Sequence, residues 1–189
     1  MPADRVGQVV ANGPADPRLR IVGPGANALD LSLSVPASGI VVAGVGARPR
    51  DVDYGEDRIG AILEEYRIPA SALAAREAMP RPGTLRVSSR RFAKTILCAA
   101  ACTDRSAASR PLGADLEFVG VDGGPDHFVL FSQGRPLLQH PVDIVTSDGN
   151  RRHVSSDAQG RVRLPDEVRG AVMLFAALMA PPAQGTGSF

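Results

Sequence analysis

Apolar and polar residues alternate along much of the chain, in short runs that end at turn-forming residues. In residues 29–35, leucine or valine occupies every second position, with Asp or Ser at each position between them. A period of two is typical of a strand with one solvent-facing side. The apolar run 40–45 follows directly after Pro-Ala-Ser-Gly at 36–39. We therefore predict that 29–35 and 40–45 form a hairpin whose second strand is buried on both faces.

The stretch 133–165 shows the clearest turn signals. Its apolar runs, 142–145 and 161–164, are separated by Ser-Asp-Gly-Asn at 147–150 and Ser-Asp-Ala-Gln-Gly at 156–160. Asp and Asn side chains bond the backbone just ahead of them, and glycine accepts positive φ. Strands that recur at roughly 8–12 residues between such turns favour an antiparallel sandwich. We interpret this stretch as the meander that organises the C-terminal half.

One segment has a helical period instead. Ile59, Ile62, Leu63 and Tyr66 recur at the spacing of one helix face. Asp53 stands three residues before Glu56, which resembles a capping box with Asp in place of Ser or Thr. We predict a helix that ends before Pro69 and a second short helix around 71–79.

The remaining apolar runs predict further strands, and the whole chain is predicted to be mainly β, with antiparallel sandwich units and one or two short helices between them. The expected strands lie at 7–10, 18–22, 92–101, 116–121, 128–131 and 172–178. The apolar run 171–180 is predicted to be buried. Residues 103–113, rich in Ser, Ala, Arg and Pro, are predicted to link a β-rich domain at 1–102, with its helical insertion at about 54–79, to a sandwich at 114–189.

Composition excludes some function classes. The 189 residues carry 21 basic and 20 acidic side chains, a net charge of +1 that gives no overall field for nucleic acid or an anionic membrane. Six Phe and two Tyr are few for stacking on bases. No apolar run reaches the roughly 18 residues of a membrane span. The N-terminus has no basic segment followed by an apolar one, which by itself predicts a cytoplasmic protein if Met1 is the true start.

Two groups of reactive or charged residues are assigned structural roles. Cys98 and Cys102 lie four apart, and a helix there would hold them at a separation poor for a disulfide. We expect two free, partly buried thiols, with a metal or redox pair as the less favoured alternative. The densest basic run ends at Lys94, the only lysine. We favour a solvated face for this run over an anion site. Its members are Arg86, Arg90, Arg91 and Lys94.

No catalytic constellation is visible, and the histidines are weak metal candidates only. Imidazole suits nickel, copper or zinc. His127, His140 and His153 show no ligand spacing, so we interpret them as scattered surface residues. The chain has no G-x-S-x-G nucleophile elbow. The glycine-rich pieces 23–25 and 44–46 do not open helices as phosphate loops do. We predict no catalytic, metal-binding or cofactor-binding residue from these patterns.

Four motifs, in order, resemble a bacterial periplasmic family of poorly defined function that includes the periplasmic component of some nickel and cobalt uptake systems. The similar segments are ASGIVV at 37–42, LEEYRI at 63–68, RFAKTIL at 91–97, and QGRPL at 133–137 together with SDAQGRV at 156–162. The last pair is similar to a hairpin shared by many Ig- and transthyretin-like domains. The resemblance covers roughly residue 18 to the end.

This resemblance implies a non-enzymatic binding or accessory module, located in the periplasm, that handles nickel or cobalt and works with a membrane component of metal transport. Members of the family begin with a signal peptide and a His-containing strand. The resemblance starts after both, which implies either that the true start lies ahead of Met1 or that this is a degenerate or truncated member, so no family metal residue is carried over. The alternative is an Ig-like domain that binds a protein or glycan without metal. A hydrolase that uses an unidentified serine, or the Cys98 and Cys102 thiols, is less favoured.

Overall fold

The chain is mainly β, with several antiparallel sheets and, in its described part, the α-helix α1 (Glu56–Glu65). The computed structural model describes residues 6–12, 19–25, 28–33, 38–68, 73–74, 77–78, 84–121 and 124–180. The chain divides into two compact units, each built from separate stretches. The first unit comprises Met1–Arg48, Arg91–His140 and Ser155–Gly170, and the second comprises Pro49–Arg90, Pro141–Val154 and Ala171–Phe189.

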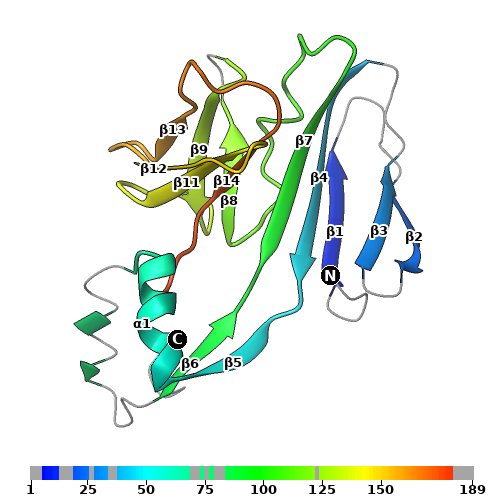
Figure 1. Ribbon diagram of the computed structural model, residues 1–189. Coiled ribbons are helices and arrows are strands. Elements are labelled where there is room, and N and C mark those ends of the chain that lie inside the picture. The colour runs from blue at the N-terminus through cyan, green and yellow to red at the C-terminus, as the bar shows by residue number, and fades with distance from the viewer. Residues whose placement is uncertain are drawn as a thin grey trace. The chain divides into compact units, whose positions relative to one another are not determined.

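The first unit contains a three-stranded sheet with β4 (Gly39–Ala47) at its centre, between β1 (Val6–Asn12) and β7 (Phe92–Ala99) (Figure 1). Both ladders are antiparallel, and Ile40, Val41 and Val42 are buried as predicted. The predicted hairpin partner is wrong. Strand β3 (Ala28–Leu33) pairs with β2 (Leu19–Gly25) rather than with β4. An alternating pattern identifies a strand and its faces, but it does not identify the neighbouring strand.

A second sheet of the first unit is arranged around β9 (His127–Ser132). Strand β9 pairs with β8 (Leu116–Gly120), with the short β10 (Arg135–Pro136) and with β13 (Arg161–Arg163), all antiparallel. One apolar residue or more from each of the three longer strands is buried, which gives this sheet its core. These residues are Val119, Val129, Leu130 and Val162.

The second unit combines a strand pair, a helix and a three-stranded sheet. Strand β5 (Arg50–Gly55) pairs with β6 (Thr84–Ser89), and Ile59 of α1 forms a buried cluster with Leu85 of β6 and with Ile68. Strand β11 (Pro141–Thr146) lies between β12 (Arg151–Ser155) and β14 (Val172–Phe175). The predicted helix that ends before Pro69 is confirmed as α1. Of the second helix expected around 71–79, Leu73, Ala74 and Glu77 are helical and Ala78 lies in a turn, while the other residues lie outside the described part.

Two local predictions in this unit are wrong. The helix begins after Gly55, which is its N-cap, and no side chain caps it, because Asp53 lies inside β5. The predicted C-terminal strand exists as β14, but it is not buried, since Met173 is 54% exposed and Phe175 is 36% exposed. The positions of β14 alternate between intermediate and exposed, so the unbroken apolar sequence was not a sign of burial.

Both turns predicted within 133–165 are confirmed, but the stretch is not one meander. Asp157 accepts hydrogen bonds from the backbone of Gln159 and Arg161, and Asp148 accepts one from the backbone of Asn150. The first and last strands of the stretch after residue 140 belong to different units: β11 pairs with β14 in the second unit, whereas β13 pairs with β9 in the first. Turn chemistry is local, so it is readable from sequence in a way that strand pairing is not.

Residues 103–113, where we predicted a linker, lie inside the first unit. Ala107 and Ala108 are buried there against Ile40 and Val42 of β4. Within the described part of the chain, no helix has the length and apolar character that crossing a bilayer would require.

Candidate functional site

The second unit holds a buried carboxylate, Asp143, with several basic groups directed at it. The side chain of Asp143 is 2% exposed and lies on β11, the central strand of its sheet. A buried charge is expensive unless it is paired and hydrogen-bonded. Its partners therefore determine whether Asp143 serves the fold alone or also a ligand.

Three side chains meet the Asp143 carboxylate, and we call the four residues the Asp143 cluster. The Arg67 guanidinium donates a hydrogen bond to Oδ1. The His153 Nδ1 lies 2.7 Å from the same oxygen, and the Arg151 Nη1 lies 3.6 Å from Oδ2. Because a carboxylate only accepts hydrogen bonds, His153 Nδ1 is the donor in this contact.

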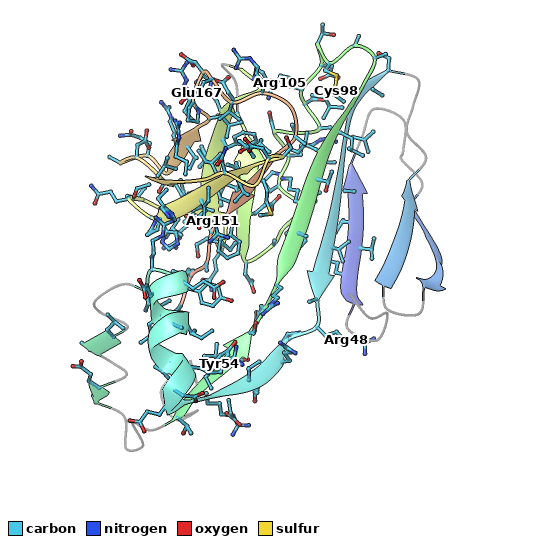
Figure 2. The ribbon with its side chains drawn as sticks, in the orientation of Figure 1. Arg48, Tyr54, Cys98, Arg105, Arg151 and Glu167 are labelled. Carbon is cyan, nitrogen blue, oxygen red and sulfur yellow. A yellow bond between two sulfur atoms is a disulfide. The ribbon has the colours of Figure 1, made fainter. Side chains whose placement is uncertain are left out.

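Local structure explains why these groups converge. Arg151 and His153 are two residues apart on β12, so their side chains leave the same face of the strand, beside Asp143 on the neighbouring β11. Arg67 follows α1 with φ of 48°, in the left-handed region where the helix has ended. Figure 2 labels Arg151 at this cluster.

An aromatic pair borders the cluster. Phe175 of β14 is directly opposite Asp143 in the ladder, and opposite residues of an antiparallel pair have their side chains on the same face. The Phe175 ring lies 6.3 Å from the Tyr66 ring, centroid to centroid. The surface beside the buried carboxylate therefore combines basic groups with aromatic carbon.

The charge of the cluster opposes cations. Two guanidinium groups, which stay charged at all ordinary pH values, face one carboxylate. A metal ion at His153 Nε2 would have to approach against both. Arg151 and His153 are 51% and 60% exposed at their side chains, so an approaching ligand can reach them. Chemically, the arrangement is suited to binding an anion.

The other two histidines lie in the first unit and do not join the cluster. His140 is buried, which corrects the prediction of a surface residue. Its backbone N–H donates to Ser156 Oγ at 2.9 Å, and its carbonyl accepts from the Ser156 N–H at 2.9 Å. Backbone pairing thus anchors this position at the end of the loop that precedes β11. Among the described residues, no group of three or more His, Cys, Asp or Glu is placed to hold a metal ion.

His127 begins strand β9, and its Nδ1 is buried without a hydrogen-bond partner in the described part of the chain. Its neighbour Asp126 is bonded to Arg163, with 3.3 Å between Oδ2 and Nε. The pKa of Asp126 is lowered, mainly by the hydrogen bond from its own backbone N–H, with smaller contributions from Arg163 and His127. The carboxylate is thus already engaged by a cation.

Arg86, Arg90 and Arg91 are exposed, as the predicted solvated basic face requires, but Lys94 is not. Its side chain is 9% exposed, and its Nζ lies 2.6 Å from Glu117 Oε1 and donates to the Phe118 carbonyl at 2.9 Å. The Glu117 carboxylate also accepts the backbone N–H groups of Leu112, Gly113 and Ala114. The basic run therefore contains a structural ion pair.

A hollow of about 220 Å³ borders Glu117 and the loop that it holds. The Glu117 oxygens are occupied by Lys94 and by backbone donors, so Glu117 is not available to a ligand in this hollow. It carries no site.

Cys98 and Cys102 form a disulfide, which corrects the prediction of free thiols. The strand predicted at 92–101 is present as β7, and residues 98–102 are not helical. Cys98 lies at the end of strand β7, and the chain turns at Ala100, whose φ is 50° (Figure 2). The turn places the two Cα atoms 5.8 Å apart, inside the roughly 4.4–6.8 Å range of disulfides. Cys102 packs against the buried residues of β4.

Sequence reasoning named His153 but missed the other three residues of the Asp143 cluster. Asp143 stands inside an apolar run, Pro-Val-Asp-Ile-Val, and a lone acid among buried positions is a signal that could have identified it. Arg67 and Arg151 carried no such signal, because the chain is rich in arginine. Comparison with protein-family models, with curated proteins and with solved structures gives no match to this chain.

Proposed function

We propose that this protein is a non-enzymatic binding or accessory module that works in an oxidising compartment such as the periplasm. The Cys98–Cys102 disulfide carries the proposal. Structural disulfides persist in exported proteins and are rare in the reducing cytosol. The four ordered motifs that resemble a periplasmic family support the same compartment.

The compartment argument is tested by comparing the oxidised and reduced chain. Protein isolated from the periplasm should resist alkylation until a reductant is added and should then take up two alkyl groups, at Cys98 and Cys102. Reduction should also lower the urea midpoint of unfolding. If periplasmic protein is alkylated without reduction, or if reduction leaves the midpoint unchanged, the disulfide is not a structural element and the compartment loses its support.

For the ligand, the family resemblance proposes nickel or cobalt. His153, whose Nδ1 is held by Asp143, has the carboxylate–histidine arrangement of many metal ligands. Arg67 and Arg151 beside it act against a cation. A melt with and without Ni²⁺ or Co²⁺ decides the point, since a ligand at 100 times its Kd stabilises a protein by about 2.7 kcal/mol. No stabilisation would reject metal binding.

A second candidate is an interaction domain that contacts a protein or glycan. It is favoured by the apolar residues exposed on β14 and after it, namely Met173, Phe175 and Leu178. Exposed apolar side chains that gather in one segment mark interaction surfaces more often than isolated ones do. Replacing Met173 and Phe175 by Ser should raise solubility and abolish partner capture. Unchanged capture would exclude this surface.

A further inference from the structure

We propose that the Asp143 cluster is a binding site for an oxyanion of the carboxylate or phosphate type, which is held by Arg151 and His153. This inference deepens the proposed binding role and rests on it, because it names the chemical class of the ligand. Three observations support it: the charge of the cluster, its number of hydrogen-bond donors, and the contacts that hold His153 and the β11–β12 turn in place.

The charge of the cluster is unbalanced. Asp143 contributes one negative charge, whereas Arg67 and Arg151 contribute two positive charges. A closed structural salt bridge would need only one of the two arginines. The excess positive charge is placed where half of the Arg151 side chain and more of the His153 side chain meet solvent.

Hydrogen-bond donors are also in excess. A guanidinium has five N–H donors in a planar fork that matches a carboxylate or a phosphate. In the described part of the chain, the contact of Arg151 is the ion pair at 3.6 Å, which is longer than a hydrogen bond. His153 uses Nδ1 on Asp143, and its other ring nitrogen, Nε2, donates to an oxyanion when it carries a hydrogen. An oxyanion that bridges these two side chains would satisfy both.

The support beneath these donors is fixed. The buried Asp143 carboxylate accepts a hydrogen bond from His153 Nδ1, so the imidazole is oriented before a ligand binds. The β11–β12 turn is closed by the Thr146 N–H, which donates to the Asn150 carbonyl at 3.0 Å, one residue before Arg151. Preorganised donors bind more tightly because less side-chain freedom is lost on binding. Phe175 beside the cluster offers apolar contact to an organic anion.

The test uses the full chain with its disulfide intact, labelled with ¹⁵N-arginine. Citrate and inorganic phosphate are titrated separately at constant ionic strength, with chloride as the balancing salt, and the arginine Nε–Hε shifts are followed. The Arg151 signal is assigned by its loss in Arg151→Gln. The matched control is Arg135→Gln, which removes the same charge from an exposed residue of β10.

We expect a saturable shift of the Arg151 signal with at least one of the two anions. Comparison of citrate with phosphate identifies which oxyanion the site prefers. Dissociation constants of the variants are then followed by the remaining arginine signals and by melting. Arg151→Gln should weaken binding by about tenfold, as the loss of a charge-assisted hydrogen bond does. Arg135→Gln should leave the affinity unchanged. His153→Gln gives a second, independent variant with the same expectation as Arg151→Gln.

Two results would overturn the inference: no saturable shift with either anion, or equal weakening by Arg151→Gln and Arg135→Gln, which would mean that only net charge matters. If Ni²⁺ raises the melting temperature but neither anion does, the oxyanion site is rejected and the proposed binding role is kept. If none of the three ligands changes the melting temperature, both proposals are rejected.

Discussion

The ion pair between Lys94 and Glu117 should be coupled to the loop that Glu117 holds, and a double-mutant cycle measures this coupling. Lys94→Met keeps the apolar stem and removes the charge. Glu117→Leu removes the carboxylate that pairs with Lys94 and accepts the N–H groups of Leu112, Gly113 and Ala114. Either change alone leaves a nearly buried charge without its partner.

The magnitudes follow from burial. Breaking a buried ion pair by removing one partner costs about 3–5 kcal/mol, so each single variant should lose that much free energy of unfolding. In the double variant Lys94→Met/Glu117→Leu no buried charge is left alone. What remains is the loss of acceptors for three backbone donors and of the Lys94 donor to the Phe118 carbonyl, at about 1 kcal/mol each or less where water reaches the group, as at the exposed Gly113. We expect the double variant to lose about 1–3 kcal/mol, less than either single variant.

The assay should separate the two units. The chain has no tryptophan, and both tyrosines, Tyr54 and Tyr66, lie in the second unit. Tyrosine fluorescence therefore reports the second unit, while amide hydrogen exchange at Leu112 and Phe118 reports the first. Urea midpoints are compared at a common slope. If the double variant is as unstable as the sum of the single variants, the pair is not coupled. If it is as stable as the parent, the three backbone hydrogen bonds contribute nothing.

Further predictions concern turns, the disulfide and acid stability. Gly160→Ala should destabilise the protein by about 2–3 kcal/mol, because φ is 75° and an added Cβ would lie 2.9 Å from Pro136 Cβ. Gly149→Ala, where φ is 86° but the space is open, should cost about 1 kcal/mol. Equal urea midpoints of the two variants would contradict this. Closing a five-residue ring should contribute about 2 kcal/mol, so the Cys98→Ser/Cys102→Ser variant should melt lower than the parent and lose its response to reductant. The hydrogen bond from the Arg161 N–H, followed by that from Gln159, lowers the pKa of Asp157 below its ordinary 3.8. The Asp157 carboxylate therefore stabilises the folded chain above pH 3.8, and this stabilisation is lost as the pH falls through the lower pKa of the folded state. Asp157→Asn should flatten the acid limb of stability measured by circular dichroism, and an unchanged limb would contradict the assignment.

Local chemistry was predictable from this sequence, and pairing was not. The turns at Asp148 and Asp157 and the helix stripe at Ile59 and Ile62 follow from neighbouring residues, and all of them are present. Strand partners depend on residues far apart in the chain, which is why β3 was assigned to the wrong neighbour.

The candidate site was partly predictable for the same reason. His153 could be named as a polar residue of interest, but its partners arrive from the end of α1 and from β11, 86 and 10 positions away. The disulfide was missed because its geometry depends on a single turn residue, Ala100, which stands in an apolar run with no glycine or proline to mark a turn.

The burial of Lys94 has a consequence for the chemical reactivity of the surface. Because it is the only lysine of the chain and its ammonium is engaged by Glu117 and a carbonyl, the folded protein presents no free lysine amine to solvent. Amine-reactive dyes and cross-linkers should therefore modify the folded chain at its α-amino group alone. Modification of Lys94 would occur only when its surroundings open, so a single labelling reaction followed by mass spectrometry would record the opening of the first unit.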